Sequence, residues 1–155
     1  MKPLLRISMV LLISSPFLTP LLAASSDLWQ MRIIPIFMTV AGLGIISIWT
    51  VDLLKKEKVS LDEGLLYIRD RETGQYILPH LLAEYGTALL LLIAAVGLCR
   101  STSWATRLSF LALGALIYTS LNSLSWVVTR RERLPYGIPM LFALAGALVS
   151  IILLF

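Results

Sequence analysis

Charged residues are scarce in this chain. Only 14% of its 155 residues are Asp, Glu, Lys or Arg, whereas 58% are hydrophobic, and the mean hydropathy is +0.88. Soluble domains carry about 25% charged residues, so this composition excludes a water-soluble globular domain. A spanning helix uses about 20 residues. The length therefore predicts a single integral membrane domain over residues 1–155 with no second domain.

Cysteine and histidine are nearly absent. The chain has one of each, Cys99 and His80, which excludes an intrachain disulfide framework and a multi-cysteine metal site. No G-x-S-x-G segment is present, so a serine-hydrolase triad is not favoured. The basic residues lie in clusters between apolar runs, a pattern that orients membrane proteins. We therefore expect no nucleic-acid partner.

Long apolar runs are abundant. They are too long for strands and lack the alternation of a membrane β-barrel. The sequence therefore predicts an all-α fold, a polytopic transmembrane helix bundle of four or five helices. The runs are Ile7 to Ala24, Ile33 to Leu54, His80 to Cys99, Leu108 to Val128 and Pro135 to Phe155.

The first run leaves the number of helices open. Lys2 and Arg6 precede it, and Ala23 and Ser25 follow a helix-disturbing Pro20. This layout is typical of a signal peptide, yet the run is nearly long enough to remain as an anchor. Residues 1–25 are thus either the first transmembrane helix or a signal peptide.

The basic residues predict an orientation in the membrane. With the N-terminus in the cytoplasm, ten basic residues lie inside and three outside, and this bias fixes topology when loops are short. We expect a multi-pass protein of the plasma (inner) membrane with its C-terminus on the opposite side. The N-terminus is cytoplasmic if the first helix is uncleaved. The inside set is Lys2, Arg6, Lys55, Lys56, Lys58, Arg69, Arg71, Arg130, Arg131 and Arg133; the outside set is Arg32, Arg100 and Arg107.

The cytoplasmic loop over residues 55–79 contains two β-prone runs. "LLYIRD" and "QYILP" flank "RETG", which predicts a short hairpin with Gly74 at the turn position of positive φ. The alternative is an irregular loop with an amphipathic turn.

Six polar residues are expected at similar depth in the cytoplasmic half of the bundle. Three of them share one face of the third helix at i, i+4 and i+7. Two lie on the antiparallel fourth helix, and the last is near the end of the second. The set is His80, Glu84, Thr87, Tyr118, Asn122 and Asp52. They form the predicted ligand-binding or proton-relay pocket.

Glu84 is the member that most needs an explanation. A charged side chain in a membrane costs about 2.5–3.5 kcal/mol at the centre of a spanning helix and marks a functional site by default. We therefore predict that Glu84 points into the bundle and contacts Asn122, Tyr118 or His80. Structural explanations stay open: Glu84 could serve only as a bonded acid, and Asp52 could pair with a lysine of the "KK" segment.

Three functions compete. The favoured one is a non-enzymatic membrane component, either a complex subunit or a small-ligand or lipid-binding bundle. The second is a proton-coupled transporter or channel that uses Glu84 and His80. The third is a metal-dependent enzyme with Asp52 as a further ligand, although H-x-x-x-E lacks a second histidine. The lipid bilayer is the expected partner, with a homo-oligomer or another membrane protein as further candidates, and no cofactor is indicated.

Overall fold

The computed structural model describes residues 32–54, 59–61, 68–70, 77–129 and 134–155. Four helices dominate it: α3 (Ile34–Leu54), α4 (Leu78–Cys99), α5 (Ala105–Thr129) and α6 (Leu134–Leu154). These bounds lie within three residues of the predicted ones. The predicted all-α bundle is confirmed, while the first apolar run lies outside the described residues.

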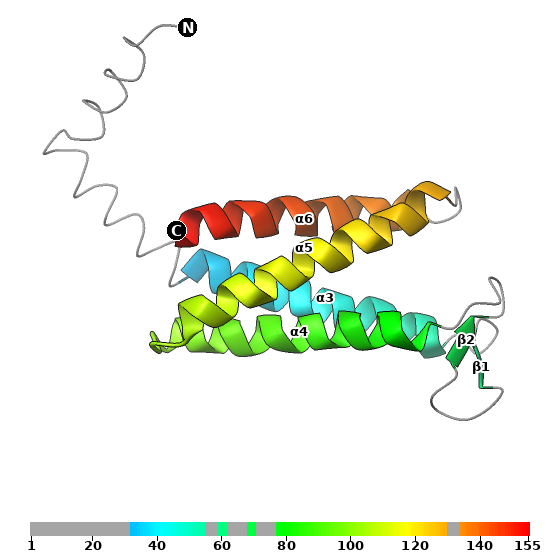
Figure 1. Cartoon of the computed structure of the whole chain (residues 1–155), viewed down its shortest axis with the longest axis horizontal. Coiled ribbons are helices and arrows are strands. Elements are labelled where there is room, and N and C mark those ends of the chain that lie inside the picture. Colours follow the sequence, from blue (N-terminus) through cyan, green and yellow to red (C-terminus); the bar gives the residue numbers. More distant parts are fainter. Residues whose placement is uncertain (1–31, 55–58, 62–67, 71–76, 130–133) are drawn as a thin grey trace, which may run out of the picture.

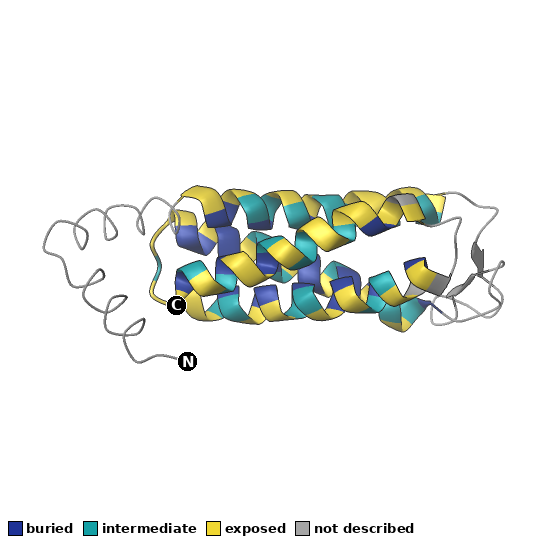
Figure 2. Ribbon diagram, turned by 90° about the horizontal axis from the view of Figure 1, so that it is seen from above, coloured by how far each residue is buried: buried dark blue, intermediate teal, exposed yellow. Residues whose placement is uncertain are grey.

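All four helices are long and apolar enough to cross a membrane. Large hydrophobic side chains are exposed on all four helices, among them Ile36, Leu89, Leu111 and Phe142. Figure 2 shows exposed positions along the whole length of the bundle. A helix satisfies all its backbone hydrogen bonds internally, which is what a hydrocarbon environment requires. The described domain is therefore that of a multi-pass membrane protein.

The helices follow one another as antiparallel neighbours (Figure 1). Helix α3 packs on α4, α4 on α5 and α5 on α6, whereas α3 and α6 make little contact. Half of the spanning part of α4 is buried inside the bundle, against 22% for α3 and for α6. Helices α4 and α5 are thus the inner pair, and α3 and α6 stand on either side of an incompletely closed gap.

Small residues let the inner helices approach closely. Ala88, Ala94 and Ala95 on α4 and Ala112 on α5 are buried, and side chains of this size allow backbones to pack tightly in lipid. Leu91 on α4 and Leu113 on α5 are fully buried and belong to the same core cluster. We call the contact between these two helices the α4–α5 seam.

A compact turn joins the two helices of the seam. The Ser101 N–H donates to the carbonyl of Leu98, and both the N–H and the hydroxyl of Thr102 donate to the carbonyl of Gly97. Ser101 has a φ of 50°, the left-handed conformation that commonly ends a helix. The side chain of Trp104 packs so closely on Gly97 that a Cβ there would lie 2.6 Å from the indole ring.

A two-stranded antiparallel sheet lies at the opposite end of the bundle, which we call the hairpin end. Strand β1 (Val59–Leu61) pairs with β2 (Ile68–Asp70), with Leu61 opposite Ile68. The predicted pairing of residues 65–70 with 75–79 is therefore wrong, because β2 pairs with a segment that precedes it. Gly74 lies outside the described residues.

The start of α4 explains this error. Ile77 is buried and α4 begins at Leu78, two residues before the predicted start, so the end of "QYILP" enters the helix. Pro79 occupies the first turn, where its missing N–H removes no helical hydrogen bond and its φ suits the helix. Leu78 and Pro79, which were expected to end a strand, instead begin a spanning helix.

Candidate functional site: a polar cluster beside an apolar groove

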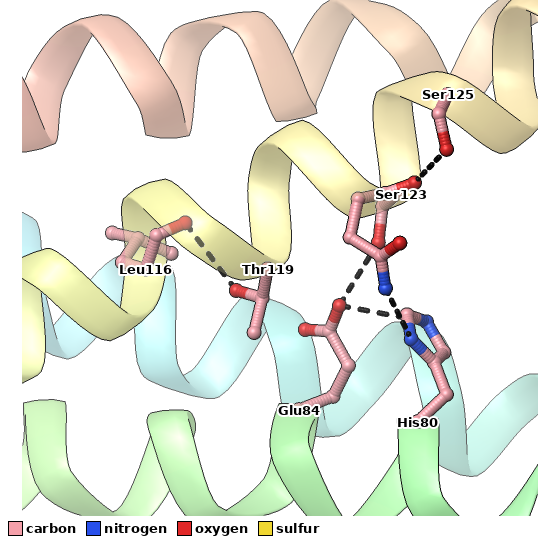
Figure 3. Close-up of polar contacts among 7 residues, drawn as sticks. His80, Glu84, Leu116, Thr119, Ser123 and Ser125 are labelled. Carbon is pink, nitrogen blue, oxygen red and sulfur yellow. Dashed lines mark hydrogen bonds and ion pairs between the residues drawn. The ribbon is translucent and has the colours of Figure 1, made fainter.

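Glu84 is the centre of a polar cluster near the hairpin end. Its side chain points into the bundle and only 4% of the residue is exposed. The hydroxyl of Ser123 on α5 donates a 2.9 Å hydrogen bond to Glu84 Oε1, and His80 Nε2 lies 3.7 Å from the same oxygen (Figure 3). The inward orientation and the contact with His80 are as predicted. The first contact is a hydrogen bond, and the second is an electrostatic contact beyond hydrogen-bond length.

Helix geometry brings these groups together. His80 and Glu84 are four residues apart and so share one face of α4. Helix α5 runs antiparallel beside it, which places Asn122 opposite His80 and Ser123 opposite Glu84. Asn122 Nδ2 lies 3.1 Å from His80 Nδ1. Because an amide nitrogen only donates, Nδ1 accepts, and the ring hydrogen of neutral His80 sits on Nε2, which faces Glu84.

Trp49 of α3 completes the cluster from a third helix. Its indole ring stands edge-on to the His80 ring, with centroids 5.0 Å apart and an interplanar angle of 76°. Trp49 also lines the same groove as Glu84. Trp49 was not among the predicted site residues. Its position three residues before Asp52, at the depth of His80, is the signal that could have done so.

The other predicted site residues are placed differently. Thr87 is buried one turn beyond Glu84, whereas Tyr118 is 65% exposed on the outer surface. Asp52 is half-buried near the end of α3. Within the described ranges, no group of three or more His, Cys, Asp and Glu side chains could hold a metal ion, so His80, Glu84 and Asp52 do not form the ligand set that the metal-enzyme hypothesis requires.

An apolar groove occupies the gap between α3 and α6. Its volume is about 700 Å³. We call it the α3–α6 groove. It is lined by Phe37, Val40, Ala41, Gly44, Ile45, Ile48 and Trp49 of α3, Glu84 of α4, Leu116, Thr119, Ser120 and Ser123 of α5, and Pro139, Met140, Phe142, Ala143, Ala145, Gly146 and Val149 of α6.

The two ends of the groove differ in chemistry. At the end away from the hairpin the Phe37 ring packs directly on Gly146 and closes the gap between α3 and α6. Trp49, Glu84 and Ser123 line the other end. From Phe37 to Trp49 the groove follows α3 for about 18 Å at 1.5 Å per residue. It is therefore an apolar slot with a carboxyl group near one end.

The polar end presents several hydrogen-bond acceptors, beside the Ser120 hydroxyl, which can donate or accept, and the Trp49 indole N–H, which donates. The Ser123 hydroxyl hydrogen is used by Glu84, and the Thr119 hydroxyl donates to the carbonyl of Leu116 at 3.3 Å. Figure 3 shows the second carboxyl oxygen of Glu84 on the side facing Thr119. Lone pairs on these oxygens thus remain as acceptors beside the groove.

A protein family described as a domain of unknown function, DUF8058, matches residues 29–154. The chain belongs to this family. The match covers all four described helices, both strands, the polar cluster and the groove. None of the curated proteins and none of the solved structures compared with the chain matches it.

Some features of this family member's site had no clear signal in the sequence. Ser123 is not among the predicted site residues, and its bond to Glu84 depends on the rotation of α5 about its axis. The groove is lined by apolar and small residues that also suit ordinary lipid-facing surfaces. The sequence pattern of these residues therefore does not indicate a groove. The groove becomes apparent only when the gap between α3 and α6 is known.

Proposed function

We propose that this protein is a non-enzymatic binder of one membrane-soluble amphipathic molecule. The apolar chain of that molecule occupies the α3–α6 groove, and its polar group lies against Glu84 and Ser123. One observation carries the proposal: an apolar slot of about 700 Å³ ends at a buried carboxyl group.

The size and lining of the groove support this function. Ligand sites typically measure about 300–1,000 Å³ and combine mostly apolar walls with a few polar groups that fix orientation. Here the polar groups are gathered near one end, so the site suits a molecule that is polar at one end only. Its exposed lining residues, such as Val40 and Val149, lie on helix surfaces that face lipid, which gives a lipid-soluble molecule a direct way in.

A groove-filling substitution tests the binding function. Gly44 lines the groove, and a Cβ there would meet no atom within 4 Å, so the side chain of Gly44→Leu has an open starting point and occupies part of the slot. Gly86 of α4 has equally open surroundings but does not line the groove, which makes Gly86→Leu the matched control.

The readout is photo-crosslinking of the purified protein to a fatty alcohol that carries a diazirine in its chain. We expect Gly44→Leu to weaken labelling about tenfold or more, a loss of ~1.4 kcal/mol in binding, while Gly86→Leu labels like the wild type. Equal labelling of both variants would contradict the proposal. Crosslinks that join two protein chains in place of the probe would instead indicate that a second copy fills the groove.

We also propose that the hairpin end faces the cytoplasm, because ten of thirteen basic residues then lie inside. The native Cys99 is exposed at the opposite end and provides a direct test. In intact cells a membrane-impermeant maleimide should label Cys99, and should not label Ser60→Cys in a Cys99→Ser background. The reverse pattern would overturn the orientation.

Proton-coupled transport is the second candidate. It is favoured by the series Asn122, His80 and Glu84, which leads from the hairpin end to the groove through contacts of 3.1 and 3.7 Å. Proton flux into liposomes should then be present and should be lost in Glu84→Gln. Absence of flux in the wild type, together with binding of the fatty probe, would leave the binding function alone.

A further inference from the structure

The charge of the groove has a consequence for its ligand. Among the described residues that line it, Glu84 is the one with an ionisable side chain, and none is Lys or Arg. The described arginines Arg32, Arg100 and Arg107 flank the helix ends away from the hairpin, whereas Arg69 lies in β2 at the hairpin end. The described lining of the groove therefore provides one carboxyl group and no Lys or Arg, and the titratable neighbour of that carboxyl group is His80, 3.7 Å away.

The hydrogen-bonding groups at the polar end of the groove also favour a ligand group that donates hydrogen bonds. The hydroxyl hydrogens of Ser123 and Thr119 are already donated to protein oxygens, so these two hydroxyls offer lone pairs to a ligand. The carboxylate of Glu84 is an acceptor when ionised. A ligand group with several N–H donors can satisfy these acceptors together, whereas a group that only accepts would leave them unpaired.

Burial adds an electrostatic reason. An ionised carboxyl group inside a membrane bundle is stable only when it is paired and hydrogen-bonded. An ammonium group supplies one positive charge and three donors. It therefore complements the polar end of the groove in charge and in hydrogen bonding, while an attached hydrocarbon chain complements the apolar remainder.

We infer that the groove selects a lipophilic primary amine, a molecule with one apolar chain and a cationic ammonium head that pairs with Glu84. This inference rests on the proposed binding function and names its ligand class. Ligands with phosphate or carboxylate heads are disfavoured, because like charges repel and both groups present acceptors to acceptors. The basic residues at 55–58 and 130–133 lie outside the described residues, so an anionic probe belongs in the test.

Three probes with the same chain separate charge from hydrophobicity: hexadecylamine, hexadecan-1-ol and palmitate. Each competes with the diazirine alcohol for the purified protein in nanodiscs of neutral lipid. We expect hexadecylamine to compete about tenfold more strongly than the alcohol, which corresponds to ~1.4 kcal/mol, and palmitate to be the weakest competitor.

Glu84→Gln should remove the preference for the amine while the alcohol competes as before, because the amide keeps the size of the side chain and loses its charge. Asp52→Asn is the matched control: it removes the same charge from a residue that does not line the groove, and it should keep the amine preference. Undiminished competition by the alcohol in Glu84→Gln guards against a folding defect in that variant.

The outcomes distinguish the two claims. Equal competition by all three probes, with binding still blocked by Gly44→Leu, would overturn the amine inference and leave the groove as a general lipid site. Strongest competition by palmitate would overturn it in favour of an anionic ligand. Failure of every probe to compete would contradict the proposed function itself.

Discussion

The α4–α5 seam and the α3–α6 groove lie in the same bundle but are filled differently. The seam is buried: its residues Leu91 and Leu113 have no exposed surface. The groove keeps about 700 Å³ that no side chain occupies. Packing in lipid gains little from hydrophobicity, because lipid tails are as apolar as leucine. A bundle of this kind can therefore be stable with one side open, provided the inner pair is tightly packed.

The polar cluster lies where the seam meets the groove. Glu84 comes from the most buried helix, its partner Ser123 comes from α5, and the carboxyl group reaches the groove lining. The seam thus holds the acid in place while the groove gives it access to a lipid-soluble ligand. The predictions that follow test this division between a structural side and a binding side.

The largest effect is expected from enlarging the seam. Leu91→Ala should lower the free energy of unfolding by about 2–5 kcal/mol, since it leaves a closed cavity in a fully packed region. Ile48→Ala removes the same number of carbons from the groove lining, where no closed cavity forms, and should change stability by about 0.5 kcal/mol or less. Unfolding by SDS titration in bicelles measures both. Similar losses of stability in Leu91→Ala and Ile48→Ala would contradict the distinction between a closed seam and an open groove.

A smaller effect is expected at Glu84. Glu84→Leu leaves the Ser123 hydroxyl without its acceptor and removes the electrostatic contact with His80, and it should cost about 1–3 kcal/mol. Glu84→Gln keeps an acceptor oxygen and should cost less than Glu84→Leu. The same titration provides the values, and a Glu84→Leu variant as stable as the wild type would show that the cluster contributes nothing to the bundle.

A Gly→Ala substitution should change the free energy of unfolding in opposite directions at the end of the seam and beside the groove. At Gly97 the new methyl group would meet the Trp104 ring at 2.6 Å, so Gly97→Ala should destabilise by about 1–3 kcal/mol. At Gly44 nothing lies within 4 Å, and Gly44→Ala should stabilise α3 by about 0.5–1 kcal/mol through lower backbone entropy in the unfolded chain. Thermal unfolding of the two variants decides the signs, and a common sign would refute the distinction.

The smallest effect is expected at the turn that ends the seam. Ser101 has a φ of 50°, a conformation that glycine adopts without the Cβ penalty. Ser101→Gly should therefore raise the free energy of unfolding by a few tenths to about 1 kcal/mol. The nearby Ser103→Gly serves as a control without that expectation. A loss of stability in Ser101→Gly would mean that the serine side chain contributes more than its backbone costs.

Sequence reasoning found the elements of the fold and part of the site. The spanning helices follow from apolar runs whose length is set by bilayer thickness, so their bounds were predictable to within three residues. The inward orientation of Glu84 and its contact with His80 follow from the cost of an acid in lipid and from spacing on one helix. The hairpin register was not predictable, because the chain between α3 and α4 offers more than two β-prone runs, and the start of α4 decides which of them remain free to pair.

The sequence by itself determined that this protein crosses a membrane as a helix bundle and that an acid lies near the hairpin end. Both results depend on local quantities, namely hydrophobicity over a helix length and the depth of one residue. Only the tertiary structure decided that Ser123 and Trp49 surround Glu84, that Tyr118 faces outward, and that α3 and α6 leave a groove. These three features depend on the rotation of each helix about its axis and on which pair of helices stays apart. Apolar residues suit lipid and protein equally well, so their sequence encodes neither the rotation nor the pairing.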